Sequence, residues 1–305
     1  MLKIIGWRLV QAVASLLVVT AGLFVVLRLT GRPENFIAHE GSTLEQRAQL
    51  RAALGLDEPL YKQFFIYINN VLHGDLGNSY SFGVPVSDLI TDRFPNTMIL
   101  TAGAMALTLA VAVPMGVYAA YWRGGRLDNT VRVGSGFGQS LPSFWFGLIL
   151  ILVFAVHFKW LPAGNAGGID HIILPALTLA FEPISRLTRL LRSSVIEELS
   201  SDYVTFLRMK GMSERTILWK HVLRNSSLTA MTFVGILLIG FLAGSVLVET
   251  VFSWPGIGQL MTDGLRQRDF AVVQGVSLVI VGLFVIGSLI VDLLYTVLNP
   301  RLRTK

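Results

Sequence analysis

Residue types that commonly form catalytic, phosphate-binding or metal sites are present in this sequence, but not at the spacings that such sites require. No lysine follows a glycine, so the chain lacks the Gly-Lys-Ser/Thr of a phosphate-binding P-loop. The histidines are scattered, with no HExxH pair for zinc, and the sequence contains neither a GxSxG nucleophile motif nor a cysteine. We therefore expect no catalytic residue, no metal site and no bound cofactor in this chain.

A charged stretch, DYVTFLRMKGMSERTILWKHVLRN at residues 202–225, separates two of the most apolar segments. Apolar residues recur every three or four positions before and within it, which predicts an amphipathic helix: Val195, Leu199, Tyr203 and Phe206. We expect that helix to end at Gly211 in a left-handed conformation.

A second helix is expected directly after this glycine. Ser213 can cap its first turn, where Glu214 is favourable, and it should continue to Leu223. The sequence therefore predicts a helix, a glycine turn and a helix that lie along a membrane surface. Amphipathicity alone leaves two interpretations open: cations that bind anionic lipid, or a surface that meets a partner protein.

The segments on either side of residues 202–225, which would hold this stretch in place, are long and apolar. The chain has 305 residues, of which 53% are hydrophobic and only 14% charged, whereas soluble domains carry about a quarter charged residues. Charge-free runs long enough to cross a bilayer predict five helices, at residues 9–27, 94–122, 133–158, 225–248 and 270–291. A sixth span at 172–190 contains Glu182 and two arginines, and we include it because otherwise its flanking loops would end on opposite sides.

The distribution of cations sets the orientation. With the N-terminus inside, the cytoplasmic segments carry 16 of the 25 Lys and Arg residues. Both termini and residues 202–225 should therefore face the cytoplasm. The net charge of +6 is then a signal of orientation, and we expect no nucleic-acid partner.

Four parts of the chain follow from this topology. Residues 1–28 form a tail and the first span, 29–96 an extracytoplasmic subdomain, 97–298 a membrane core and 299–305 a cytoplasmic tail. The core includes a cytoplasmic loop at 191–225. Within the outer subdomain we expect helical stretches at 43–54 and 61–72.

Several motifs along nearly the whole chain resemble one transporter family. The pattern DYV-x3-R-x-KG-x-SER…H-x2-RN is similar to the cytoplasmic EAA loop of ABC-importer permeases. Further matches to permeases of dipeptide, oligopeptide and nickel importers are LGLDEPLYKQF, GDLGNSYSFGVPV, RFPNT, LPSFWFG, WLPAG, LVETVFSWPGIGQL, RDF and VDLLYTVLNPR. The chain resembles the first of the two permease subunits of such an importer.

This resemblance implies an all-α, polytopic type I ABC importer permease in the inner membrane. Its partners would be membrane lipid, a second homologous permease, two cytoplasmic ATPases that bind ATP and Mg, and an extracytoplasmic substrate-binding protein. The cargo would be di- or oligopeptides, with nickel chelate, glutathione and haem as alternatives. The chain itself would not be an enzyme.

The resemblance also implies roles for particular residues. Coupling to the ATPases would involve Arg208, Lys210, Gly211, Ser213, Glu214 and Arg215. Where the family has alanines, this sequence has Thr205, Phe206 and Leu207, with Met209 before Lys210, so we expect an ATPase with a matched groove.

Two further sets of residues are expected on the substrate's route. Glu182 either lies in the substrate path and binds a peptide ammonium group, or forms a neutralised pair with Arg186 one helical turn later. A gate or binding-protein contact would be formed by Trp254, Pro255, Gly256, Gln259 and Arg268.

Rival functions fit the sequence less well. An ion-coupled secondary transporter would predict internal repeats and more polar residues in the spans, which we do not find. A structural or sensor protein would leave residues 202–225 without a role.

Overall fold

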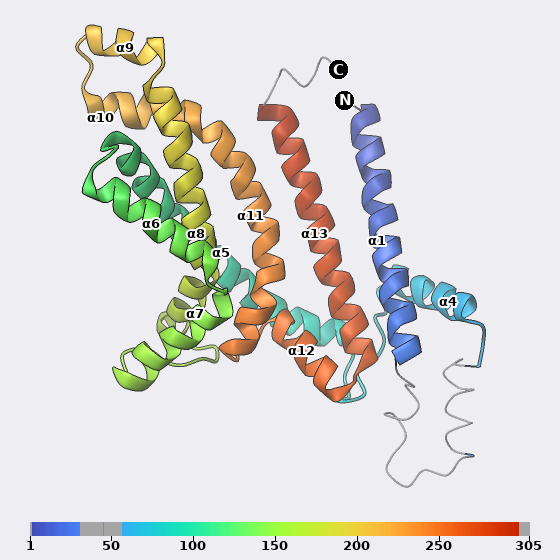
Figure 1. The fold of residues 1–305 in the computed structure, drawn as a ribbon. Helices are drawn as coiled ribbons and strands as arrows, with labels where there is room; N and C mark the ends of the chain where they lie inside the picture. The colour runs from blue at the N-terminus through green and yellow to red at the C-terminus, as the bar shows by residue number, and fades with distance from the viewer. Residues whose placement is uncertain (1, 31–44, 46–56, 299–305) are drawn as a thin grey trace. The chain divides into compact units, whose positions relative to one another are not determined.

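The computed structural model describes residues 2–30, 45 and 57–298 (Figure 1). In these ranges the chain is helical apart from turns, bends and a single isolated bridge between Asn78 and Pro85, which confirms the expected all-α fold. Its contacts divide it into two compact units, Met1–Thr97 with Pro255–Leu289, and Met98–Trp254 with Ile290–Lys305.

The first unit is built from two long apolar helices and three shorter helical pieces. They are α1 (Leu2–Thr30), α4 (Leu60–Leu72), the first turns of α5 (Val86–Tyr121), α12 (Ile257–Gln267) and most of α13 (Phe270–Leu298). Its core consists of buried aliphatic side chains, among them Val86, Ile257, Leu260 and Val272.

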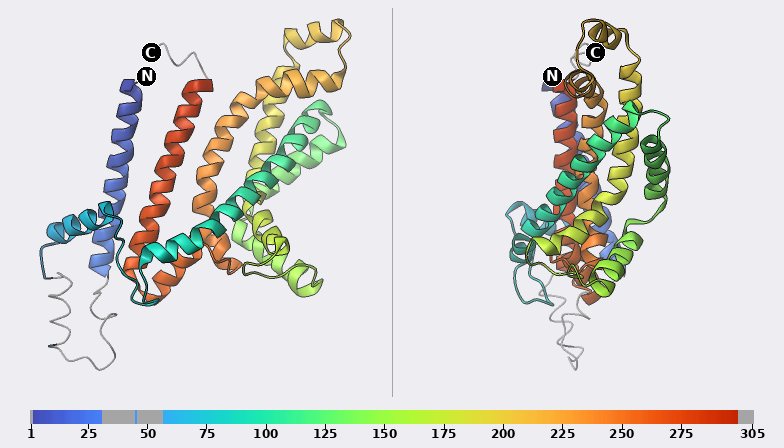
Figure 2. Two further views of the ribbon diagram at one scale, coloured as in Figure 1. Left: turned by 180° about the vertical axis from the view of Figure 1, so that it is seen from behind. Right: turned by 90° about the vertical axis from the view of Figure 1, so that its left-hand side faces the viewer.

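The second unit contains the rest of α5 and the helices that follow it, drawn from two further sides in Figure 2. They are α6 (Arg126–Ser140), α7 (Ser143–Leu150), η1 (Ile151–His157), α8 (Ile169–Leu199), α9 (Asp202–Met209), α10 (Glu214–Thr216), η2 (Ile217–Val222) and α11 (Leu223–Val251). Helix α8 is central, because α6, α7 and α11 all pack against it.

Close packing around α8 depends on small residues. A Cβ atom on Gly116 of α5 would lie 2.8 Å from Leu191 Cβ and 3.0 Å from the Thr188 carbonyl oxygen. These distances leave no room for a side chain, so glycine lets α5 and α8 approach closely.

Four described helices are long and apolar enough to cross a membrane: Val10–Leu29, Val86–Tyr121, Ala230–Val251 and Phe270–Val291. The expected straight span at 133–158 is instead a pair of helices, Arg126–Ser140 and Ser143–His157, bent by 104°. Pro142 lies at this break, where its ring cannot continue a helix and its preceding residue favours an extended backbone. The expected span at 172–190 lies within the 31 residues of α8, whose charges distinguish it from the four apolar helices.

In the predicted extracytoplasmic subdomain, the helix expected at 61–72 is confirmed as α4. The other expected helical stretch, 43–54, lies outside the described residues except for residue 45, and the tail at 299–305 also lies outside them.

Candidate functional site

The turn at Gly211 has the geometry that the sequence predicts. Gly211 has φ of +77°, and Lys210 is the last residue before it with a helical backbone. The amide of Gly211 donates to the Arg208 carbonyl at 2.9 Å, and the amide of Met212 donates to the Leu207 carbonyl at 3.3 Å. These two bonds form a Schellman motif, which satisfies the free carbonyls at the end of α9.

The helix after the turn begins with the expected cap. The amide of Thr216 donates to Ser213 Oγ at 3.3 Å, and the hydroxyls of Ser213 and Thr216 lie 2.8 Å apart. Across the turn, Arg208 donates to both carboxylate oxygens of Glu214, at 2.8 and 3.3 Å. The hydrogen bond to Glu214 raises the pKa of Arg208 above its usual value, and this charge-assisted pair joins α9 to α10.

The inner face of this segment rests on a separate apolar cluster. Val204 of α9 and Ile217 of η2 are fully buried, and they pack with Val195 of α8 and Val117 of α5. Burial of aliphatic side chains on both sides of the glycine turn fixes the position of α9 relative to the ends of α5 and α8.

The opposite face of α9 is exposed and partly apolar. Phe206 and Met209 are 52% and 75% exposed, and the ammonium of Lys210 lies 4.6 Å from the centre of the Phe206 ring. Arg215 lies just beyond the turn and is also exposed. We call Phe206, Met209 and Lys210 the α9 tip.

The second helix departs from the sequence prediction. We expected a short surface helix that ends at Leu223, but α10, η2 and α11 follow one another without a break from Glu214 to Val251. The sequence from Leu223 onward contains no proline until Pro255, so nothing in it interrupts the helical hydrogen bonds. In Figure 1 this continuous helix runs beneath α9 and then curves into α11.

An ion pair that the sequence did not predict supports the same end of the unit. Asp128, in the first turn of α6, is almost completely buried and accepts from Arg192 of α8, with the Nη2 to Oδ2 distance 2.9 Å. The same carboxylate accepts from the amide of Gly124, which has a φ of +80°. Arg192 lies ten residues before α9, so the pair joins the α5–α6 turn to the helix that leads into α9.

The expected gate residues divide between the two units. Trp254 is only 3% exposed and belongs to the apolar cluster of the second unit; its role in a gate or a binding-protein contact stays a prediction. Its size and aromatic character explain the burial, because a large ring filling a core is a common alternative to an interfacial position.

The other expected gate residues lie in the first unit, at the start and end of α12. The side-chain amide of Asn96 donates to the Pro255 carbonyl, and the amide of Ile257 donates to Thr97 Oγ1, both at 2.9 Å. Gly256 precedes α12 with an extended backbone, and Gln259 accepts from Arg93 at 3.5 Å. The RFPNT motif therefore holds the start of α12.

A buried carboxylate holds the end of α12. Asp269 is 2% exposed and accepts from the hydroxyl of Ser79 at 2.6 Å and from the amide of Ser81 at 3.0 Å. It also caps α13 by accepting from the amide of Val272. Arg268, immediately before it, is exposed and has a left-handed backbone with φ of 56°. Segments far apart in the sequence thus meet in one assembly, which we call the outer assembly and define as residues 79–97 and 255–274.

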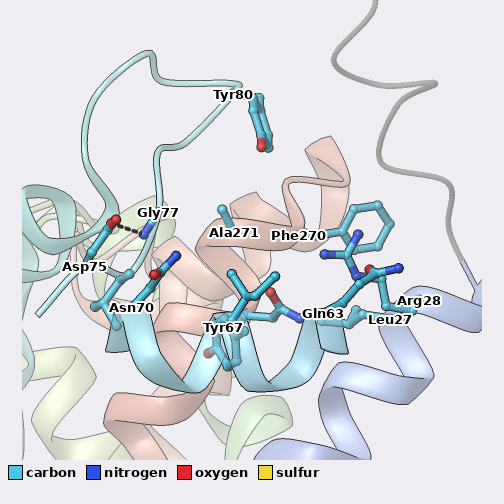
Figure 3. A pocket seen from close by; sticks show the side chains of 13 residues that line it. Leu27, Arg28, Gln63, Tyr67, Asn70, Asp75, Gly77, Tyr80, Phe270 and Ala271 are labelled. Carbon is cyan, nitrogen blue, oxygen red and sulfur yellow. Dashed lines mark hydrogen bonds between the residues drawn. The ribbon is translucent and has the colours of Figure 1, made fainter. Parts of the chain in front are cut away.

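A cavity of about 220 Å³ lies beside this assembly, within the first unit (Figure 3). Its walls come from α1, α4, α13 and the loop before α5, and its lining includes Arg28, Asn70, Asp75, Tyr80 and Phe270. Asp75 accepts from the amide of Gly77 at 2.8 Å, which holds the loop at the cavity wall. Burial raises the pKa of the Tyr80 hydroxyl above its usual value.

Glu182 lies midway along α8 and forms an ion pair with Arg186. The carboxylate side chain is 28% exposed and the arginine 56%. The expected i,i+4 pairing is confirmed. The role of Glu182 in the substrate path stays a prediction.

Comparisons with known proteins agree with this architecture. The profile described as "Binding-protein-dependent transport system inner membrane component" matches residues 112–304. The profile of the corresponding N-terminal region matches residues 1–101.

Proteins similar to this chain over nearly its whole length are named as permeases. The oligopeptide transport system permease protein AppB of Bacillus subtilis is 36% identical over 97% of both chains. The dipeptide permease DppB and the glutathione permease GsiC of Escherichia coli K12 are 36% and 38% identical, each over 100% of both chains.

Solved structures share the fold of part of the chain. Two inward-facing structures of the MetNI methionine ABC transporter align with TM-scores of 0.55 and 0.60, at 18% and 16% identity. The alignments cover 67% and 69% of this chain and 95% and 96% of the solved chains. This chain therefore belongs to the family of binding-protein-dependent transport system inner membrane components and is a permease of the dipeptide and oligopeptide ABC importer family.

Proposed function

We propose that this chain is the first of two permease subunits of an ATP-driven importer that carries peptides into the cytoplasm by alternating access. The observation that carries the proposal is the α9 tip, which projects exposed apolar and cationic side chains from a rigidly braced turn. Two cytoplasmic ATPases would bind ATP and Mg and would receive this tip in a groove. The chain would then have both termini in the cytoplasm.

The braced turn would transmit movement in two directions. Because α9 follows α8 after two residues, a displacement of the tip would pull on the end of α8. Because α10 continues through η2 into α11, the same displacement would tilt the cytoplasmic end of α11. The Arg208–Glu214 pair and the buried Val204 and Ile217 would keep the tip from moving independently of these helices.

On the other side of the membrane, the outer assembly would meet a substrate-loaded binding protein. Between the expected contact residues Gln259 and Arg268, the exposed positions are Leu265, Arg266 and Gln267, and Arg268 itself is exposed. Asp269 would keep the end of α12 and the loop at 79–82 in fixed register, so a docking force on Arg268 would reach α13 directly.

The similar proteins AppB, DppB and GsiC are named for oligopeptide, dipeptide and glutathione transport. These names support a peptide or a peptide-like thiol as the cargo of this chain. Glutathione is itself a short peptide. Nickel chelate and haem remain alternatives of the same architecture.

Site-directed crosslinking tests the proposal. The chain has no cysteine, so the single thiol introduced by Met209→Cys can be joined to the purified partner subunits with a short bifunctional reagent. We expect a product with the ATPase, and none for Asn78→Cys in the outer loop. Crosslinking of Met209→Cys only to lipid-facing probes would contradict the coupling role.

The cargo is tested separately. ATP hydrolysis by the reconstituted transporter is measured with binding protein loaded with a dipeptide, a longer peptide, glutathione or a nickel chelate. We expect stimulation by a peptide, and stimulation by the metal chelate alone would overturn the peptide assignment.

A further inference from the structure

Helix α4 has more apolar surface than its packing uses. Tyr61, Phe65 and Leu72 are 67%, 69% and 79% exposed. They are spaced by four and seven residues, which places them on one side of the helix together with half-buried Ile68. Exposed apolar residues scattered singly are ordinary on a protein surface, but a continuous stripe indicates contact with something apolar.

A neighbouring face of α4 is packed on α1. The ring of Phe24 lies 5.5 Å from the ring of Phe64, in an edge-on arrangement, and 5.8 Å from the ring of Tyr67. Phe24 is almost completely buried by these contacts. This aromatic contact fixes where along α1 the shorter helix lies.

That position corresponds to the boundary of the bilayer. The apolar span of α1 runs from Val10 to Leu29. Phe24 precedes Leu29 by five residues, and at about 1.5 Å per residue the contact therefore lies ~7.5 Å inside the end of the span. Helices that lie in a membrane interface bury their apolar face by about 5–10 Å.

The remaining face of α4 is polar and points elsewhere. Gln63 and Asn70 line the cavity together with Tyr67, as Figure 3 shows. Lys62 forms an exposed ion pair with Glu58 at 2.7 Å, one helical turn earlier in the chain. The helix is thus polar toward the outer assembly and apolar toward α1 and the unpartnered stripe.

We infer that α4 is an interfacial helix whose stripe of Tyr61, Phe65 and Leu72 is embedded in lipid of the leaflet that holds the C-terminal end of α1. The stripe lies at the depth where headgroups meet acyl chains, on a helix packed against α1, whose Val18 and Leu29 are 70% and 73% exposed. A membrane surface supplies an apolar partner there without any further protein chain. This inference does not depend on the peptide cargo or on the identity of the ATPase.

Spin labels on single cysteines test it in the complete transporter in lipid nanodiscs. The label is placed at Phe65→Cys and, as a second site on the stripe, at Leu72→Cys. Asn70→Cys is the matched control, since Asn70 is exposed on the polar, cavity-lining side of the same helix. Val18→Cys calibrates the bilayer interior and Asn78→Cys the aqueous phase.

Collision rates with oxygen, which concentrates in lipid, and with a water-soluble nickel complex are then compared. We expect the ratio of oxygen to nickel collisions at residues 65 and 72 to exceed that at residue 70 severalfold and to fall between the two calibration sites. A water-like ratio at residues 65 and 72 would overturn the inference. Protection from both reagents would overturn it as well, because it would mean that the second permease or residues 31–56 of this chain cover the stripe.

Discussion

Asp128 has a buried charge whose partners include Arg192, 64 residues further along the chain. A buried carboxylate is stable only when its charge is compensated, and here the guanidinium and the Gly124 amide both donate to it. The local stretch RGGRLD carries a partial signal, because two glycines predict a turn and an aspartate four residues after the first can accept from its amide. Nothing in the sequence around Asp128 identifies Arg192 as its partner, because α8 contains several arginines that could have formed the pair.

Asp128→Asn is predicted to destabilise the second unit. The substitution leaves Arg192 without its anion, and loss of one member of a buried pair costs about 3 kcal/mol, at the lower end of the range because Arg192 is 17% exposed. The thermal unfolding temperature of the purified chain should fall clearly, while Asp202→Asn, at an exposed position of α9, should leave it unchanged. Equal unfolding temperatures for Asp128→Asn and the unmodified chain would show that the pair is not structural.

Glu182→Gln is predicted to change the apparent affinity for peptide by less than about twofold, since an i,i+4 partner already stabilises its charge. Peptide uptake at graded concentrations measures this. Arg186→Gln is the matched variant, because it leaves the carboxylate without its intrahelical partner. A tenfold rise in the KM of Glu182→Gln, with unchanged protein abundance, would instead place the carboxylate in contact with the substrate.

At the scale of elements, helix boundaries were predicted most accurately where a residue type has one strong conformational preference. Gly211 and Ser213 marked a helix end and a helix start, and both are confirmed in the Schellman motif and the cap. The 104° break before α7 was missed because prolines are common within membrane helices, so Pro142 alone did not distinguish a kink from a break. The continuation of α10 into α11 was missed because the start of the span was placed after the last charged residue. Charged residues mark the edge of the apolar segment, but they do not end a helix.

The α9 tip is predicted to be necessary for assembly with the ATPases. Phe206→Asp and Met209→Asp each place a carboxylate where we expect an apolar groove, and should lower recovery of the ATPases with the permease at least severalfold. Ser200→Asp is the control, because Ser200 is exposed next to α9 but outside the tip. The helical content of the variants is checked by circular dichroism, and undiminished ATPase recovery for both tip variants would argue against the groove.

At the scale of the whole molecule, the sequence predicts six spans, with residues 202–225 on the cytoplasmic side and residues 29–96 on the opposite side. The structure describes four apolar helices, a bent pair and the more charged α8, which together account for the six expected segments. The orientation was predicted from cations near the membrane and not from packing, so a labelling experiment must test it.

Single cysteines in this cysteine-free chain provide the label sites. Asn78→Cys, in the outer loop, should react with an impermeant thiol reagent in intact cells. Asn129→Cys and Ser213→Cys, both exposed, should react only after the membrane is opened. Labelling of Ser213→Cys in intact cells would reverse the proposed orientation.

The central claim is that the turn at Gly211 couples the ATPases to the permease, and substitution of this glycine tests it most directly. No atom lies within 4 Å of the position that a Cβ on Gly211 would take, so Gly211→Val adds backbone strain of about 1–2 kcal/mol without a steric clash. Gly74→Val is the matched control, since Gly74 has φ of +83°, equally open surroundings and a place in the outer loop.

Peptide transport per ATP hydrolysed is the quantity to measure, in vesicles that contain the complete transporter with either variant. The account predicts that Gly211→Val lowers this ratio severalfold, while peptide binding by the external protein is unchanged and Gly74→Val transports with the normal ratio. Normal transport per ATP by Gly211→Val, in a complex that retains its ATPases, would contradict the coupling role of this turn.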